Sequence, residues 1–431
     1  MATDLYARLQ ELKKHQRSHA LPPDAAAPKT APQAVTGHSP GSGWERIAPG
    51  VYERSQVYSM GDRSLPFELD DGGRWYRFPP LLGPYSGTRP LFLDVETSGL
   101  SGGAGSTAFL IGVGVFSGGA EREATLTVYQ LFLSEPAGEA ALLSRFGELV
   151  GDPAHTCYVT YNGAGFDLPV LRTRHILNRT WMPEANHWDL MPLTRRLYAP
   201  AIGSCSLGRV ERLVLGLSRD DDVPGSEVPS RYHRFLEHGD PEEIAPVVAH
   251  HYYDVAHLAL LAARLHEIVD QGRDGVGGAA YDRVGLAKLL LHRGGAAVLP
   301  RCAAVLDEVI EETEQRRRHV AAAARAGGFA SRMTSRPPRA WSESRELRAV
   351  VARRLGQWEV LREVRWSVWN VRGSQRDAVE LAKVLEHRFR DYSGARSVLE
   401  EWAQRAGESD AAIMHRMERL RRKGNHSSRR S

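Results

Sequence analysis

Three apolar runs dominate the segment between residues 91 and 133: LFLDVE, TAFLIGVGVF and TLTVYQLFL. Runs that are apolar at nearly every position predict strands covered on both faces, and short glycine-rich connections predict antiparallel pairing. The helical pattern AGEAALLSRFGELV and a fourth strand, CYVTY, come next. A strand reached through a helix usually runs parallel to its partner. The pattern therefore predicts a mixed α/β sheet flanked by helices, with the acidic strand LFLDVE at its centre.

Two later segments have the period of amphipathic helices. The first begins near Phe166, directly after a strand end, which is where α/β sheets place residues that contact ligands. Its predicted buried face consists of Leu168, Leu171 and Ile176. The second spans 241–269, with Pro and Glu in its first turn. Its apolar stripe consists of Ile244, Val247, Val248, Val255 and Leu258.

The chain divides by composition into five predicted segments. They are an N-terminal helix with a Pro/Ala-rich linker (1–43), a short β-rich lead-in (44–90), the α/β domain (91–270), helical repeats (282–423) and a basic tail (424–431). In the fourth segment LAKLLLHR recurs as LAKVLEHR, and LRAVVARRL is similar to both. The interval from Arg354 to Arg388 is 34 residues, the tetratricopeptide period. We predict an all-α module of irregular tetratricopeptide-like repeats, ending in a disordered basic stretch, RRKGNHSSRRS.

Composition excludes several classes of protein. The three cysteines, Cys157, Cys205 and Cys302, are far apart, which argues against a zinc knuckle or a disulfide framework and fits a reducing compartment. The N-terminus lacks the pattern of a signal peptide. The longest apolar stretch, 108–116, is shorter than the roughly 20 residues that a bilayer span needs. We expect a soluble, cytoplasmic protein with no membrane partner.

Charge is distributed unevenly along the chain, although the net value is only +4. From Asp282 to the end there are 31 Lys and Arg against 19 Asp and Glu, a net charge of +12, and the preceding residues carry −8. This asymmetry suggests an acidic catalytic body and a basic portion that contacts nucleic acid or a protein partner. Arginine-rich helices that are simply solvated are the alternative.

The acidic strand carries the first candidate chemistry. Residues two apart in a strand point to the same face, so Asp94 and Glu96 project together. Neighbouring carboxylates raise each other's pKa and need a compensating cation. Mg²⁺ and Mn²⁺ are suited to that role because they prefer oxygen ligands. The alternative is a strand end at which both side chains turn outward into solvent.

Further acidic residues lie at the two predicted helices. Asp167 falls in the first turn of one helix, where acids also serve as ordinary caps. On the second helix Asp254 follows His250 by four positions and His251 by three, which places the histidines within about 40° and 60° of it around the helix. A solvent-facing His–Asp pair is the alternative. Asp189, in HWDL, is either a carboxylate behind the site or a helix cap.

The three stretches FLDVETSGL, YNGAGFDLPVL and HHYYDVAHL occur in this order. They resemble the exonuclease motifs of the DEDD (DnaQ-like) 3′–5′ exonucleases, and most closely the YprB-type ribonuclease H-like domain, over about 91–270. The resemblance implies a ribonuclease H-like fold. It also implies four metal-binding carboxylates: Asp94, Glu96, Asp167 and Asp254. The superfamily usually has Tyr four or His five residues before the last Asp, whereas this chain has His250 and Ala249 at those positions.

The resemblance further implies a metal-dependent 3′–5′ exonuclease that hydrolyses single-stranded RNA or DNA with two divalent ions, Mg²⁺ or Mn²⁺. Asp94, Glu96 and Asp254 would hold one ion, Asp94 and Asp167 the second, and His250 would accept a proton from water. Candidate substrate-binding residues are Tyr161, Asn162 and Phe166, although the aromatic residues equally suit a core and Asn162 a plain turn. The alternative functions are a catalytically inactive nucleic-acid-binding adaptor and a pure repeat scaffold.

Overall fold

The protein is described here by a computed structural model. The structure describes residues 38–58, 87–99, 105–117, 125–219, 223–271, 280–326, 337–407 and 410–427. The predicted N-terminal helix over residues 1–20 lies outside the described residues.

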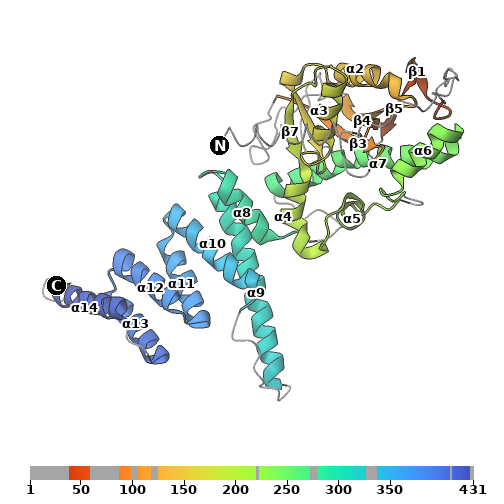
Figure 1. Ribbon diagram of the computed structural model, residues 1–431. Coiled ribbons are helices and arrows are strands. Elements are labelled where there is room, and N and C mark those ends of the chain that lie inside the picture. Colours follow the sequence, from red (N-terminus) through yellow and green to blue (C-terminus); the bar gives the residue numbers. More distant parts are fainter. Residues whose placement is uncertain are drawn as a thin grey trace, which may run out of the picture. The chain divides into compact units, whose positions relative to one another are not determined.

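A seven-stranded mixed sheet forms the centre of the N-terminal region (Figure 1). Its strands are β1 (Glu45–Ala48), β2 (Val51–Tyr58), β3 (Arg89–Thr97), β4 (Ala108–Ser117), β5 (Thr125–Leu133), β6 (Thr156–Thr160) and β7 (Asn186–Asp189), in the spatial order β1-β2-β5-β4-β3-β6-β7. β3, β4 and β5 pair antiparallel, and β6 runs parallel to β3, as the apolar pattern predicts. The acidic strand β3 lies inside the sheet, between β4 and β6. β1 and β2 extend the same sheet beyond β5.

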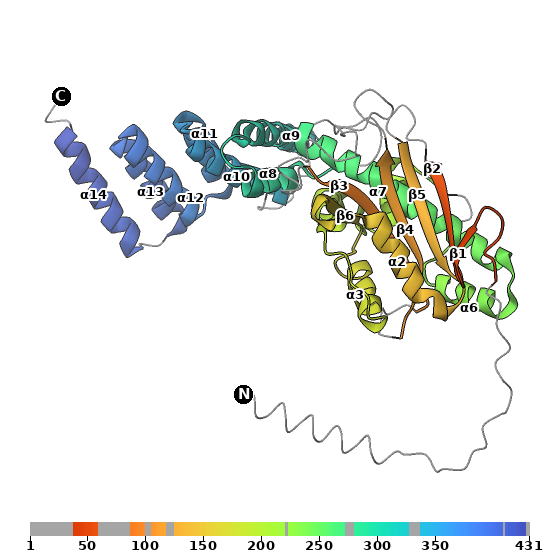
Figure 2. The same cartoon turned by 90° about the horizontal axis from the view of Figure 1, so that it is seen from above.

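Helices cover both faces of this sheet. Those of the N-terminal region are α2 (Glu139–Val150), α3 (Asp167–Leu177), α4 (Leu190–Ile202), α5 (Leu207–Val210), the π-helical turn η4 (Glu211–Leu215), α6 (Val228–His238) and α7 (Pro241–His266). In β3, Leu91, Leu93 and Val95 pack with α2 and α3, and Phe92 on the opposite face packs with the C-terminal half of α7. Figures 1 and 2 show α2 and α3 on one side of the sheet and α7 on the other.

The two predicted helices form where the periodicity places them. Every residue of the predicted apolar stripe in α7 is buried. In α3, Leu168 and Leu171 are buried, but the prediction for Ile176 is wrong, since 74% of it is exposed. His175 is buried in its place. Seven residues are nearly two full turns, so His175 returns to the side of Leu168, whereas Ile176 is rotated a further 100° or so.

The described residues of the C-terminal region form helices and no strands, as predicted. Its helices are α8 (Arg283–Arg293), α9 (Leu299–Ala326), α10 (Arg339–Leu355), α11 (Trp358–Arg372), α12 (Gln375–Val384), α13 (Tyr392–Ala406) and α14 (Ala411–Ser427). Consecutive helices from α8 to α14 pack against each other. Whether they are tetratricopeptide-like repeats stays a prediction. Among the described residues, no helix is both long and apolar enough to cross a membrane.

The predicted disorder of the stretch from Arg421 onward is wrong in part, because α14 continues to Ser427. Two contacts explain the longer helix. Leu420 is buried in the apolar core of the last helices, and Lys423 pairs with the buried Glu386 at 2.8 Å. These contacts give the helix an anchored face that the polar composition of the stretch does not reveal.

A glycine in β4 sets how closely α7 approaches the sheet. Gly112 lies opposite Asp94 in the β3–β4 register. A Cβ atom at this position would lie 2.5 Å from His251 Cε1 and 2.5 Å from Val255 Cγ2. Real Cβ atoms do not approach other atoms this closely, so α7 sits over the acidic strand only because residue 112 has no side chain.

Gly112→Ala should therefore push α7 away from β3. We expect a loss of about 1–3 kcal/mol in the free energy of unfolding, which is the usual cost of overpacking, measured by urea denaturation. Gly147→Ala is the matched control, because a Cβ at this helical position meets only Pro183 Cγ, at 3.9 Å, and alanine favours the helix. A Gly112→Ala protein with the wild-type denaturation midpoint would contradict this account.

Candidate active site

The carboxylates of β3 lie at the point where the strand leaves its parallel neighbour. The last β3–β6 pair is Phe92 with Val159, so Asp94 and Glu96 lie beyond the paired end of β6. They share the strand face of Phe92 and point towards α7. The carboxyl ends of parallel strands are where α/β folds gather ligand-binding groups. Both acids of β3 thus lie at the carboxyl end of the parallel β3–β6 pair.

The turn between β6 and α3 brings Asp167 to the same edge. Asn162 has a left-handed backbone (φ 68°), which asparagine tolerates better than most residues. Asp189 holds this turn by accepting hydrogen bonds from the amides of Asn162 (2.8 Å) and Ala164 (3.2 Å). It also caps α4 through the amide of Met191. Asp189 is therefore a helix cap, which is one of the two roles predicted for it. It also stabilises the turn before Asp167.

Helix α7 contributes Asp254 and His250. His250 Nε2 lies 3.1 Å from Asp254 Oδ2 and 4.0 Å from Glu96 Oε1. One ligand atom from each of these three residues lies within 4.8 Å of the others. The side chains of His250 and Asp254 are only 14% and 13% exposed, so they do not form a solvent-facing pair. The structure thus brings together groups that are more than 150 residues apart in the sequence.

His251 has a different position from His250 and is completely buried. The side-chain amide of Gln130 donates to His251 Nδ1 (2.9 Å), and its oxygen accepts from Arg54 Nε (2.8 Å), which fixes the orientation of the amide. His251 Nε2 therefore carries the proton and donates to the backbone carbonyl of Asp94 (3.2 Å). Burial lowers the pKa of His251 to about 4, which keeps the ring neutral. His251 connects α7 to β3.

Arg219, in the segment after η4, completes the cluster. Its Nη2 lies 2.5 Å from Asp254 Oδ1 and also pairs with Glu211. Its Nη1 donates to the carbonyl of His250 (3.0 Å) and contacts His250 Nδ1 (3.4 Å). Glu211 is itself buried and accepts from His257 Nδ1 at 2.8 Å. The guanidinium is thus held between two carboxylates.

Sequence reasoning missed Arg219 and Gln130. Gln130 had a usable signal, since it is the one strongly polar residue in an otherwise apolar half of its strand, YQLFL. A polar side chain in such a strand must find a partner inside the protein. Arg219 precedes three aspartates, which is typical of a solvated loop, and nothing in its neighbourhood points to a residue 35 positions further along.

Electrostatics divide the four carboxylates into two groups. Burial and the negative charges of neighbouring acids raise the pKa of Asp94 well above its ordinary value. Burial, with the charge of Asp254, raises the pKa of Glu96 to about 8. Burial raises the pKa of Asp167 to about 7, against hydrogen bonds from the backbone amides of Asp167 and Val95. Burial opposes ionisation of Asp254 too, but His250 and Arg219 lower its pKa to about 2.

These residues fit a divalent cation. Glu96, Asp254 and His250 each place one ligand atom within 4.8 Å of the others, and carboxylates with an imidazole suit Mg²⁺ or Mn²⁺. Asp94 and Asp167 lie near enough to act on the pKa values of these acids. The pKa values of Asp94, Glu96 and Asp167 are raised because too little positive charge lies nearby to stabilise their ionised forms. A bound cation supplies that charge. Glu96, Asp254 and His250 are the residues of the cluster that would hold it, and ligation by Asp94 and Asp167 stays a prediction.

The three predicted substrate-binding residues lie around the β6–α3 turn. Tyr161 is half-buried, and its hydroxyl donates to the carbonyl of Cys205 at 2.6 Å. Asn162 is exposed, and Phe166 is partly buried at the residue before α3. Binding of substrate by these residues stays a prediction, and the hydrogen bond of Tyr161 to Cys205 also gives it a structural role.

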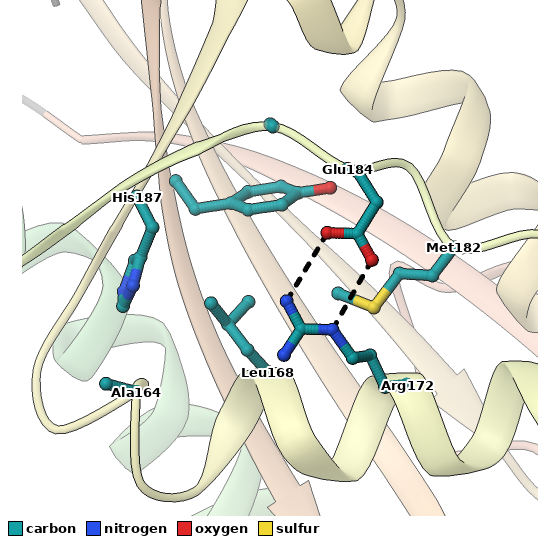
Figure 3. A pocket seen from close by; sticks show the side chains of 8 residues that line it. Ala164, Leu168, Arg172, Met182, Glu184 and His187 are labelled. Atoms are coloured by element: carbon teal, nitrogen blue, oxygen red, sulfur yellow. Dashed lines mark hydrogen bonds and ion pairs between the residues drawn. The ribbon is translucent and has the colours of Figure 1, made fainter.

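A small cavity of about 200 Å³ flanks the same turn (Figure 3). Ala164 and Leu168, which line it, lie on either side of Asp167 in the sequence. Figure 3 shows Arg172 and Glu184 paired across it, with nitrogen–oxygen distances of 3.3 and 3.4 Å. None of the four carboxylates lines this cavity. The cavity therefore adjoins the β6–α3 turn and is separate from the carboxylate cluster.

Comparison with known proteins assigns the central domain. Residues 91–266 match the family model described as RNase_H superfamily. YprB of Bacillus subtilis (strain 168), described as an uncharacterized protein, is 38% identical over 186 residues, which cover 42% of this chain and 42% of YprB. The match therefore spans less than half the length of this relative.

Solved structures give only weak overall similarity. The family B DNA polymerase of the archaeon Pyrobaculum calidifontis has a TM-score of 0.33 and 16% identity, with 57% of this chain and 34% of that chain covered. Exonuclease I of E. coli in complex with a dA16 oligonucleotide has a TM-score of 0.24 and 13% identity, with 79% and 99% covered. Overall similarity at this level carries no argument about function. The sheet topology and the family match agree, and residues 91–266 of this chain form an RNase H-like domain of the RNase H superfamily.

Proposed function

We propose that this chain is a metal-dependent nuclease that removes nucleotides from the 3′ end of single-stranded nucleic acid. The observation that supports the proposal is the cluster of Glu96, His250 and Asp254 in an RNase H-like domain, with Asp94 and Asp167 near enough to act on these acids electrostatically. The 3′ to 5′ direction and the DEDD assignment rest on the motif resemblance alone. The choice between RNA and DNA depends on recognition of the 2′-hydroxyl.

Each residue has a proposed role. Asp94, Glu96 and Asp254 would hold one divalent cation, and Asp94 and Asp167 would hold a second. When bound, such cations act as Lewis acids and lower the pKa of water. His250 lies at the Glu96–Asp254 side of the cluster and takes up the proton of the attacking water. Buried His251 holds α7 against β3 and takes no proton.

The C-terminal helices are proposed to form tetratricopeptide-like repeats that hold a nucleic-acid strand or a protein partner. Their net positive charge supports this role, but several arginines are already paired inside the module. Arg348 pairs with Asp307 (2.7 Å) and Arg345 with Glu314 (3.1 Å). The charge available to a phosphate backbone is therefore smaller than the sequence count suggests.

One observation favours the alternative of a catalytically inactive adaptor. Arg219 holds Asp254 Oδ1 and so provides a cation where a metal ligand is proposed. A site that relied on arginine in place of a metal would bind nucleic acid without cleaving it. The two functions differ in their response to divalent ions and to loss of Asp254.

Asp254→Asn should lower the rate of cleavage by roughly 10²–10³-fold or more, because a lost metal ligand removes several kcal/mol of transition-state stabilisation. The assay uses 3′- and 5′-labelled single-stranded RNA and DNA, with Mn²⁺, Mg²⁺ or EDTA. We expect products that shorten from the 3′ end only when a divalent ion is present.

The matched control for this experiment is Asp240→Asn, the same chemical change in the same helix. Asp240 is an exposed cap, and asparagine caps a helix equally well. Its cleavage rate should equal that of wild type. Binding of labelled strands without products, unchanged by EDTA and by Asp254→Asn, would instead support the adaptor.

Substitution of His250 should mainly change kcat, whereas substitution of His251 should mainly change the free energy of unfolding. His250→Gln removes the proton acceptor and should lower kcat by about 10²–10⁴-fold, with a smaller loss of stability than His251→Gln because His250 is partly exposed. His251→Gln breaks the buried contacts of His251 with Gln130 and Asp94. It should lower the free energy of unfolding by about 1–3 kcal/mol. The reverse assignment would follow if His251→Gln abolished cleavage in a protein of wild-type stability.

A further inference from the structure

Both carboxylate oxygens of Asp254 are engaged within the protein. Oδ1 accepts from Arg219 Nη2 at 2.5 Å, and Oδ2 lies 3.1 Å from His250 Nε2. The side chain of Arg219 is only 8% exposed, so this contact is not a loose surface pair. A guanidinium stays charged at every pH relevant here and can only donate. Any cation that binds Asp254 must therefore share or replace its contact with Arg219.

We propose that Arg219 is an internal counter-ion that holds Asp254 until a divalent cation takes this carboxylate. The guanidinium and the divalent cation compete for Asp254. Arg219 is thus a positioning residue that sets the affinity of the site for metal. This inference rests on the proposed function, because it concerns the same metal site.

Release of Arg219 from Asp254 leaves the guanidinium with a second partner. Glu211 pairs with the same Nη2 atom, is only 2% exposed, and is held in place by His257 at 2.8 Å. Arg219 can move away from Asp254 and still keep its charge paired inside the protein. Displacement therefore does not leave an uncompensated buried charge, which is what usually makes breaking a buried ion pair costly.

The test is the affinity for Mn²⁺, measured by titration calorimetry on the full chain without nucleic acid. Arg219→Gln should bind Mn²⁺ about tenfold more tightly than wild type, because it removes a like charge close to the ion. Glu211→Gln/Arg219→Gln removes both members of the buried pair and guards against misfolding of the single variant. It should bind Mn²⁺ more tightly as well.

Arg212→Gln is the matched control, since Arg212 is an exposed arginine in η4, next to Glu211 in the sequence. Its Mn²⁺ affinity should equal that of wild type. A second readout is thermal unfolding. A ligand that binds more tightly stabilises more at the same excess, so saturating Mn²⁺ should raise the unfolding temperature of Arg219→Gln by more than that of wild type.

The outcomes separate the two proposals. If wild type binds Mn²⁺ and Arg219→Gln binds it equally or more weakly, competition is wrong and the metal-dependent nuclease stands. If neither wild type nor any variant binds Mn²⁺, both the nuclease and the competition are wrong. Tighter binding by both Arg219 variants, with Arg212→Gln unchanged, supports the competition.

Discussion

The arrangement of the site depends on one constraint, the burial of several carboxylates between β3 and α7. Like charges held close together in a medium of low polarity repel strongly, so the fold must hold the two elements together against that repulsion. Apolar packing along α7 and the absence of a side chain at Gly112 provide the close approach. The hydrogen bonds that join Arg54, Gln130, His251 and the carbonyl of Asp94 fix the approach from inside the sheet.

The four carboxylates differ in how readily they ionise, and this difference bears on what the site can bind. Asp254 is stabilised as an anion by Arg219 and His250, whereas Asp94, Glu96 and Asp167 resist ionisation. A purely structural network would pair each acid with a cation. Groups with strongly perturbed pKa values gather at functional sites because stability is given up there for chemistry. Full ionisation of these three acids needs a further positive charge nearby, which a divalent cation would supply.

In the helical C-terminal region, a buried acid is paired with several basic residues. Its buried Glu386 is surrounded by Arg416, Arg419 and Lys423, all within 3.2 Å. Here basic residues satisfy an acid and tie α14 to the helices before it. A single count of lysine and arginine therefore overstates the exposed positive surface. The distinction between basic composition and a basic surface bears on any role of this region in contacting nucleic acid.

The amino-acid sequence by itself determined the four strands β3 to β6 and the long helix α7, and it singled out the acids of the candidate site. These features follow from local periodicity: apolar runs make strands, a 3.6-residue stripe makes a helix, and residues two or four apart share a face. The order of three motifs then pointed to one site. The periodicity failed at Ile176, where His175 lies closer to the buried stripe.

Only the tertiary structure decided which partners the acids acquire. His250 and His251 are adjacent in the sequence, yet one faces the carboxylates and the other is locked inside the sheet, because packing of α7 sets its rotation about its own axis. Arg219 reaches Asp254 from a separate segment, and no local pattern records such a contact. Charge partners brought together by packing depend on strand register and helix rotation, which are properties of the whole fold.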